Sequence, residues 1–300
     1  MSNTGSAEKF SITAIGTCRL DAPLRLGAQE SGLSWTGQRI YGYAHSISEC
    51  VQQVRFLKHE YVPDPALWDI IGKKNLKRAL SERHQPSDLY LLEISSRKQL
   101  YVDEHAVQIN HLKSKCFPFL SDVGRKTHYW NLLRRKDFAG QRQMVDDFAA
   151  EFGLSEHVHE ILIKLRLEDT TDADLIKGLG EVREFLQEPT IVTHVNALDR
   201  MGQPIPSRAL CVEQVERVSK SLGLAVFNPT SLMQEFGQDN AIEDESDSLA
   251  HFTEAFSGRL FERWHEEFLM RRIDEVLIST PTEPNRSKYA AHITSRAKLG

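Results

Sequence analysis

Short apolar runs rich in β-branched residues alternate, along this chain, with segments whose apolar residues recur at helical spacing. The first run, residues 10–16, ends at a glycine and predicts a buried strand. Further strands are predicted at residues 39–43, 89–95, 190–195 and 224–229. Strands that alternate with helices favour a parallel sheet covered on both faces. We therefore expect a three-layer α/β/α fold around a mainly parallel sheet.

Residues 104–188 interrupt this alternation, because their pattern is mostly helical and contains no strong strand. We expect this segment to be a helical insertion or cap. The α/β core is then expected at residues 1–103 and 189–278. The polar residues 279–300 show no period, and we expect them to form a mobile C-terminal tail.

Composition narrows the class of protein. With 300 residues, of which 40% are apolar, the chain can bury a substantial core. The net charge of −5 is small, and the basic clusters are typical of solvated helix faces, so we do not expect a nucleic-acid partner. The first ten residues lack the apolar core of a signal peptide, and no apolar run is long enough to span a bilayer. We expect a cytoplasmic protein, and the sequence does not indicate its oligomeric state.

The loops that follow the strands are the expected place for chemistry, because ligands of open parallel sheets bind at the carboxyl ends of the strands. In the loop after the first strand, Cys18 is expected to begin a helix, whose dipole would stabilise a thiolate. Cys18 is therefore a candidate nucleophile, and the first amides of the helix could hold an oxyanion. Cys50, Cys116 and Cys211 form no CxxC pair and are interpreted as small buried apolar residues.

A thiol nucleophile needs a base, and His251 is the best placed of the twelve histidines. It lies in an acidic segment just before the last long helix, where neighbouring acids could orient its ring. Taken alone, however, Gly-Thr-Cys is a weak pattern, and a loop histidine more often serves no catalysis. The residues by themselves therefore leave both interpretations open.

Other polar residues at the strand ends are candidates for substrate binding. Arg19 could hold a substrate anion or be a solvated charge, and we favour the first because a cation at a helix N-terminus opposes the dipole. His194 is interpreted first as a hydrogen-bonded core histidine and second as a pocket residue. The same rule of strand ends adds His45 and Asn196.

Two histidines in the stretch "HVHE", residues 157–160, raise the question of a metal site. We do not expect one, because alternate residues of a helix face different sides. We expect no cofactor either.

The turn "IGTCRL", residues 15–20, resembles the first block of the SGNH (GDSL-type) hydrolase superfamily. In that superfamily a Gly-Asp-Ser turn after the first strand carries the nucleophile. The GSCFA-type and capsular polysaccharide biosynthesis branches are closer, since their block contains a cysteine. This resemblance implies a flavodoxin-like fold and gives Cys18 the position of the nucleophile, with its backbone amide in the oxyanion hole.

Three later stretches resemble the remaining blocks in the superfamily's order. Residues 41–53 resemble the second block, which implies that Ser46 contributes to the oxyanion hole. In the third block, Ser95 or Ser96 would replace the usual asparagine. "DSLAHF" resembles the final Asp-x-x-His block, with His251 as the base. Here Ser248 occupies the usual aspartate position and Asp247 precedes His251 by four residues, so either Asp247 completes a triad or a Cys-His dyad operates.

The resemblance implies an ester hydrolase or acyltransferase that forms an acyl-enzyme. Its substrate would be a small-molecule or glycan acyl ester, with acyl-CoA as a candidate donor. The alternative is a non-catalytic glycan-binding or scaffold protein that keeps the fold after losing the third-block asparagine and the regular Asp-x-x-His spacing.

Overall fold

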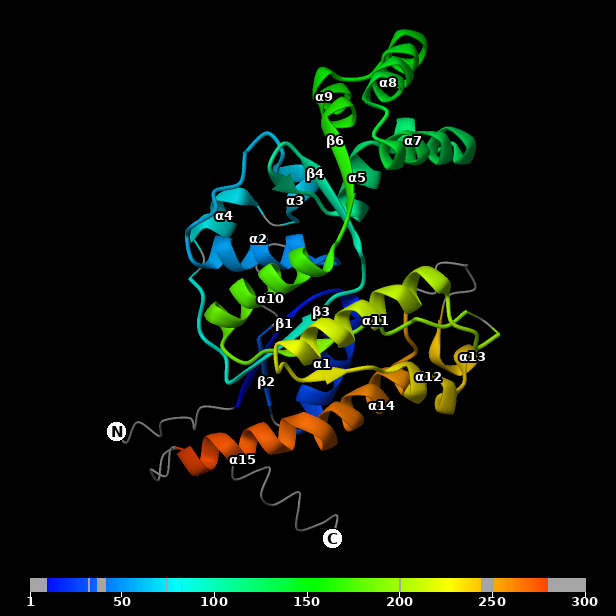
Figure 1. The fold of residues 1–300 in the computed structure, drawn as a ribbon. Helices are drawn as coiled ribbons and strands as arrows, with labels where there is room; N and C mark the ends of the chain where they lie inside the picture. Colours follow the sequence, from blue (N-terminus) through cyan, green and yellow to red (C-terminus); the bar gives the residue numbers. More distant parts are fainter. Residues whose placement is uncertain are drawn as a thin grey trace. The chain divides into compact units, whose positions relative to one another are not determined.

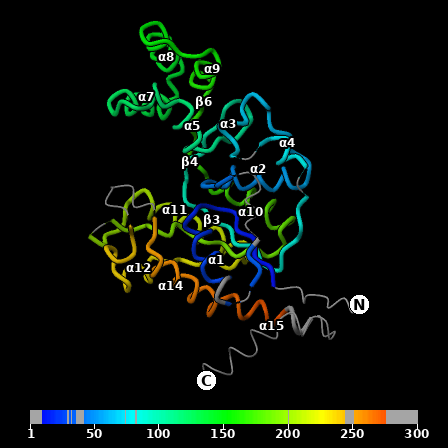
Figure 2. The backbone as a smooth tube through the Cα atoms, turned by 180° about the vertical axis from the view of Figure 1, so that it is seen from behind, coloured from blue at the N-terminus to red at the C-terminus, as the bar shows by residue number. Residues whose placement is uncertain are grey.

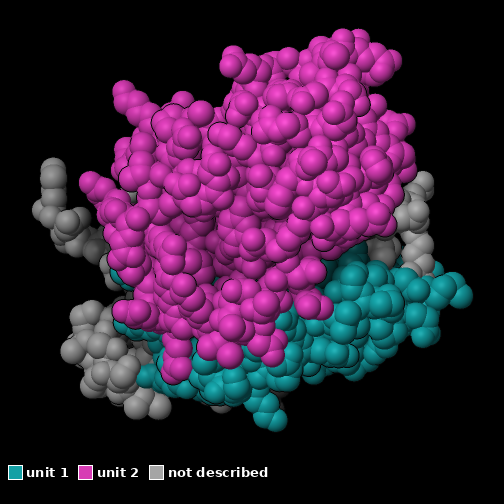
Figure 3. All heavy atoms as spheres, turned by 45° about the horizontal axis from the view of Figure 1, so that its top comes forward, with its two compact units in different colours: residues 1–39, 85–95, 186–300 teal, residues 40–84, 96–185 magenta. Residues whose placement is uncertain are grey.

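The computed structural model describes residues 10–31, 33–36, 42–73, 75–81, 83–199, 201–243 and 251–279. By its internal contacts the chain divides into two compact units, which Figure 3 colours separately. Unit 1 comprises residues 1–39, 85–95 and 186–300, and unit 2 comprises residues 40–84 and 96–185.

Unit 1 is built on a five-stranded parallel sheet (Figure 1). In spatial order its strands are β2 (Ser34–Thr36), β1 (Ser11–Ile15), β3 (Leu89–Glu93), β7 (Thr190–Val192) and β8 (Val226–Phe227). Counted along unit 1 alone, this order is 2-1-3-4-5, the order of flavodoxin-like doubly wound sheets. The direction of winding reverses between β1 and β3. Ligands of such sheets bind outside the carboxyl ends of the strands at this switch point.

Helices cover both faces of this sheet, so the expected three-layer α/β/α fold is confirmed. α1 (Cys18–Ser31) and α14 (Glu254–Trp264) pack together on one face, and α11 (Pro206–Ser221) lies on the other (Figure 1). α14 continues through a π-helical turn, η1 (His265–Leu269), into α15 (Met270–Ser279), so that the three form one continuous rod (Figure 2). The short helices α12 (Thr230–Phe236) and α13 (Gln238–Ala241) complete the unit.

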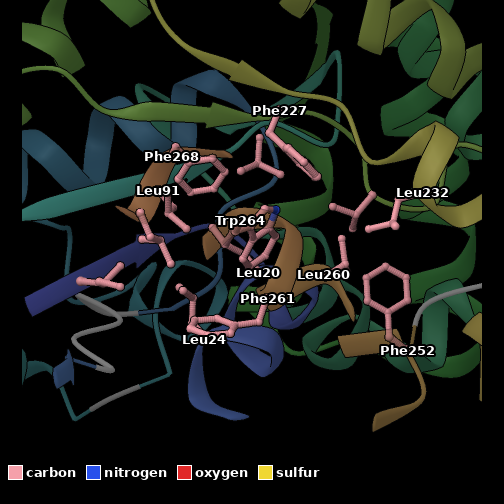
Figure 4. Close-up of a cluster of buried hydrophobic side chains, with 14 of the residues drawn as sticks. Leu20, Leu24, Leu91, Phe227, Leu232, Phe252, Leu260, Phe261, Trp264 and Phe268 are labelled. Carbon is pink, nitrogen blue, oxygen red and sulfur yellow. The ribbon is translucent and has the colours of Figure 1, made fainter. Parts of the chain in front are cut away.

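The core of unit 1 lies between the sheet and the α1/α14 pair (Figure 4). Leu20 and Leu24 of α1 meet Leu260 and Trp264 of α14, all fully buried. The last long helix expected from the sequence is therefore present, and it buries one apolar face against α1. The helices approach closely because α1 has a glycine, Gly27, beneath the ring of Phe261: a Cβ there would lie only 2.0 Å from that ring.

Unit 2 contains a three-stranded antiparallel sheet, in the order β5 (His105–Ala106), β4 (Lys98–Val102) and β6 (Leu165–Asp169). Its helices are α2 (Ile47–Leu57), α3 (Trp68–Ile71), α4 (Leu76–Ser81), α5 (Ile109–Lys115), α6 (Phe117–Leu120), α7 (Val123–Arg135), α8 (Phe138–Phe152), α9 (Glu156–Lys164) and most of α10 (Asp172–Leu186). Capping boxes begin α2, where Ser46 pairs with Glu49, and α10, where Thr171 pairs with Asp174.

Two expectations about strands were wrong. Residues 165–169 form β6, although no strand was expected there, because its partner β4 lies more than sixty residues earlier and its own pattern is short and charged. The strand expected at 39–43 lies partly outside the described residues, and its described part, Gly42 and Tyr43, is not a strand. The place beside β1 is instead taken by β2.

The division into units differs from the predicted boundary at residue 104, since residues 40–84 group with residues 96–185. One reason is the side chain of Gln52 on α2, which pairs with the backbone of Ala106 in β5 through two hydrogen bonds of 2.8 Å. The side-chain amide of Gln52 forms the hydrogen bonds that a neighbouring strand would form with β5. It therefore fixes α2 to the small sheet. The tail expected from residue 279 lies, apart from its first residue, outside the described residues.

None of the helices in the described ranges is long and apolar enough to cross a lipid bilayer.

Candidate functional site

The loop after β1 places Cys18 at the switch point of the sheet. Cys18 is the first residue of α1 and is partly exposed, whereas Cys50, Cys116 and Cys211 are buried as expected. Burial raises the pKa of the Cys116 thiol to about 12. Among the four cysteines, Cys18 is therefore the one that solvent can reach.

Gly16 lets the chain turn against the end of β3. A Cβ at this position would lie 2.6 Å from the Cβ of Glu93, so a larger residue would push the two strand ends apart. The glycine thus allows the loop after β1 to lie directly on Glu93, the last residue of β3.

A network of polar side chains joins the loops after β1 and β3. Glu93 is fully buried, and its Oε2 accepts hydrogen bonds from the backbone N–H of Thr17 (2.8 Å) and from the Thr17 hydroxyl (2.5 Å). Its Oε1 lies 3.2 Å from Arg19 Nη2 in an ion pair. Arg19 Nε also donates to Thr17 Oγ1 at 3.1 Å. These contacts fix the residues on both sides of Cys18.

The loop after β7 joins the same network. Arg19 Nη1 donates to Asn196 Oδ1 at 2.8 Å, and Arg208 Nη1 donates to the Asn196 carbonyl at 2.5 Å. Burial lowers the pKa of Arg208, and the charge of Arg19 lowers it further. His194 is also buried, and its Nδ1 accepts from the Asn196 backbone at 3.4 Å. Substrate binding by Arg19, His194 and Asn196 stays a prediction, while their contacts here bind the loops to one another.

Cys18 and His251 line one pocket, of about 430 Å³. His251 is exposed, and its carbonyl accepts a hydrogen bond of 3.0 Å from the Glu243 amide. The segment then enters α14, whose first turn is capped by Thr253. Glu243 and Glu254 line the same pocket, so the pocket contains two carboxylates besides His251. Asp247 and Ser248 lie outside the described residues.

Ser95 follows β3 after one intervening residue, Ile94, and remains a candidate oxyanion donor. It is 8% exposed, and within the described part of the chain its hydroxyl has no hydrogen-bond partner. A buried hydroxyl without a partner is costly, so such groups need an explanation such as a ligand.

His45, Ser46 and Ser96 belong to unit 2 and have hydrogen bonds there. The backbone N–H of Ser46 donates to Glu49 Oε2 at 2.8 Å within the capping box. The backbone N–H of Ser96 donates to the His45 carbonyl at 2.9 Å. His45 and Ser96 also line a separate pocket of about 270 Å³. The expected oxyanion role of Ser46 and Ser96, and substrate binding by His45, stay predictions.

The histidines of "HVHE" have different partners. His157 Nε2 lies 3.4 Å from an oxygen of Asp69, and His159 Nε2 lies 2.6 Å from an oxygen of Asp146. In the ranges that the structure describes, no three His, Cys, Asp or Glu side chains are grouped so that they could hold a metal ion.

The sequence analysis did not identify three residues of this polar network, Glu93, Thr17 and Arg208. Glu93 did carry a signal, since it is an acidic residue at the end of an otherwise apolar strand. A charge at such a place is expected to be buried and paired.

The strand order and the polar network at the switch point define a doubly wound α/β protein with a cysteine in its candidate site. The chain belongs to the family described as the TviD N-terminal domain, whose model matches residues 10–267. It is 29% identical over 257 residues to the Vi polysaccharide biosynthesis protein TviD of Salmonella typhi. That alignment covers 85% of this chain and 31% of the relative, so the chain spans about a third of the relative's length. No solved structure matches the chain.

The predicted similarity to polysaccharide biosynthesis proteins is confirmed by this relative. Membership of the SGNH superfamily stays a prediction.

Proposed function

We propose that this protein is an acyl-transfer enzyme of SGNH type that acts in polysaccharide biosynthesis, with Cys18 as nucleophile and His251 as base. One observation carries the proposal: Cys18, at the start of α1 and at the switch point of the sheet, shares a pocket with His251. The printed name of the Salmonella typhi relative supports a carbohydrate substrate.

In the first half of the reaction, His251 takes the thiol proton and the Cys18 sulfur attacks the carbonyl carbon of an acyl ester or thioester. A tetrahedral oxyanion forms and collapses with cleavage of the bond to the leaving group. The leaving alkoxide or thiolate takes the proton from His251, and the acyl group stays on sulfur as a thioester.

In the second half, water or a sugar hydroxyl attacks this thioester while His251 accepts its proton. The Cys18 sulfur leaves and regains the proton, and a carboxylic acid or a new sugar ester is released. Water as the acceptor makes the protein a hydrolase, and a sugar hydroxyl makes it an acyltransferase.

The oxyanion needs hydrogen-bond donors, and unit 1 offers the first turn of α1 and Ser95. The dipole of α1 favours negative charge at Cys18, and the unpartnered Ser95 hydroxyl could donate to it. For the acid that orients His251, Asp247 stays a prediction, and Glu243 and Glu254 are further candidates because they line the pocket.

The decisive experiment is a search for the acyl-enzyme. The protein is incubated with acetyl-CoA or with p-nitrophenyl acetate, and the intact mass and the peptide map are recorded. We expect an added acetyl group on Cys18, with the buried Cys116 as an internal control that stays unmodified. Acetyl-CoA without an acceptor should leave the adduct in place if the protein is a transferase.

Two variants test the roles. Cys18→Ala should abolish the adduct, and His251→Ala should slow its formation by about a hundredfold or more. His128→Ala, an exposed histidine of α7, serves as the matched control and should react as the wild type does. Wild-type adduct formation in the His251 variant would refute the role of His251 as base. No adduct in the wild type would favour the alternative of a non-catalytic glycan-binding protein.

A further inference from the structure

Unit 2 contains a pocket, of about 270 Å³, whose rim is cationic. Three long basic side chains line it, from three different elements: Lys98 on β4, Lys113 on α5 and Arg134 on α7. Residues that are far apart in the sequence thus bring positive charge to one place.

An acid near these charges is only weakly coupled to them: Asp169 acts on Lys98 without forming an ion pair with it. Within the described part of the chain, none of Lys98, Lys113 and Arg134 forms an ion pair. The pocket is also lined by one described carboxylate, Glu49, which accepts hydrogen bonds from the backbone N–H groups of His45 and Ser46. The Oε2 atom of Glu49 is therefore engaged in the cap of α2, and its Oε1 lies 3.8 Å from His45 Nδ1.

The basic groups also affect one another. Partial burial lowers the pKa of Lys98, and the nearby charge of Arg134 lowers it further. Partial desolvation likewise lowers the pKa of Lys113, although its side chain reaches solvent. An anion in the pocket would relieve this repulsion, because an opposite charge favours the protonated form of each lysine.

The inner surface of the pocket is apolar. Trp130, Leu100 and Val107 line it together with the cations. An indole offers a flat apolar face for a ring and a polar N–H at its edge. The pocket therefore combines a surface for a ring-shaped body with a rim for a negative group, as small-molecule sites commonly do.

We propose that this pocket binds an anionic sugar unit, whose ring lies on Trp130 and whose carboxylate or phosphate meets Lys98, Lys113 and Arg134. The choice of a sugar rests on the proposed function in polysaccharide biosynthesis. The preference for an anion stands on the pocket alone. The site would give the protein selectivity for acidic saccharides.

The test is calorimetric titration of the full chain, at low salt, with D-glucuronate, D-glucose 6-phosphate and D-glucose. We expect saturable binding of at least one of the two anions and much weaker binding of glucose. The two anionic arms distinguish a carboxylate ligand from a phosphate ligand. Equal binding of glucose and the anions, or no binding of any of the three, would overturn the proposal.

Variants locate the binding. Lys113→Gln and Arg134→Gln should each weaken anion binding by about tenfold, because each removes a charged hydrogen-bond donor. Both side chains are exposed, so the variants should fold. Arg135→Gln is the matched control, since Arg135 is the next residue of α7 and does not line the pocket. An equal loss in the Arg135 variant would mean unspecific attraction and would contradict the site.

The two proposals can fail separately. Cys18→Ala should keep anion binding while losing the acyl adduct, and Arg134→Gln should keep the adduct with p-nitrophenyl acetate, which carries no anionic sugar. If the adduct is absent but glucuronate binds, the chemistry is refuted and the anion site remains.

Discussion

At the scale of single residues, Glu93 shows how a buried charge can organise a loop. Removing a carboxylate from water is expensive, and Glu93 is fully buried at the end of β3. Two hydrogen bonds from Thr17 and the ion pair with Arg19 offset that cost. The position of the loop that carries Cys18 therefore depends on a residue from another strand.

Replacement of Glu93 by glutamine should destabilise the protein by about 3 kcal/mol, because the largely buried Arg19 side chain, which is 11% exposed, would lose its counter-charge. The measurement is urea unfolding. The double variant Glu93→Gln with Arg19→Gln should recover part of the loss, since no buried charge is then left unpaired. Purely additive losses would show that the ion pair does not couple the two residues.

A second prediction concerns the reactivity of the cysteines. In the folded protein at pH 7.5, iodoacetamide should modify Cys18 well before Cys50, Cys116 or Cys211, because Cys18 is partly exposed and begins a helix. The raised pKa of Cys116, about 12, keeps that thiol protonated. Peptide mapping after short exposure measures the order. Urea-unfolded protein is the control, and there the four should react alike; equal rates in the folded state would refute the expectation.

At the scale of elements, the contact between α1 and α14 depends on a residue without a side chain. Gly27 lies beneath Phe261, and the two helices bury most of the core of unit 1 between them and the sheet. Helix propensity favours alanine over glycine by about 1 kcal/mol, but here packing opposes it.

Gly27→Ala should lower the free energy of unfolding by about 1–3 kcal/mol, since the new methyl group would overlap the Phe261 ring. Gly180→Ala on α10 is the matched control, because a Cβ there meets no atom within 4 Å. That control should be neutral or more stable by up to about 1 kcal/mol. Chemical unfolding of both variants is the measurement, and an equal effect in the two would contradict the role of the close approach.

Unit 2 has an element that should respond to pH. Burial lowers the pKa of His111 on α5 below its ordinary 6.5, and the charge of Lys73 lowers it further. Neither ring nitrogen of His111 has a hydrogen-bond partner among the described residues. The folded protein therefore disfavours the protonated form of the His111 ring.

As the pH falls through 6.5, the unfolded chain binds a proton at His111 that the folded chain binds only at lower pH, so stability is lost below that pH. We expect a lower urea midpoint at pH 5.5 than at pH 7.5. His111→Gln should reduce the difference between the two midpoints, while His128→Gln, an exposed position, should not. An unchanged difference in the His111 variant would refute this assignment.

At the scale of the whole molecule, the sequence predicted the sheet of unit 1 better than unit 2. The strands at β1, β3, β7 and β8 are short apolar runs, and burial on both faces makes such runs visible. β6 was missed because its residues are largely charged and its pairing with β4 is long-range. Local periodicity does not encode such a partner.

The residues of the candidate site likewise divide into those that the sequence predicted and those that it did not. Cys18 and His251 were predicted from strand ends and from a family resemblance, and both line one pocket. Glu93 was not identified, because its role depends on the register of β3 beside β1. Ser46 and Ser96 lie in unit 2, which the alternation of strands and helices did not separate from the core.

The path of the chain between the units determines which strands can pair while the protein is being synthesised. β3 pairs with β1 and β7, yet residues 85–95 are flanked on both sides by segments of unit 2. A chain that emerges from the ribosome thus presents all of unit 2 before β7 and β8 exist. Until β7 is synthesised, the edge of β3 that pairs with β7 has no partner strand. Its free backbone groups can then pair with other chains. Chaperone dependence during translation is therefore expected to centre on β3.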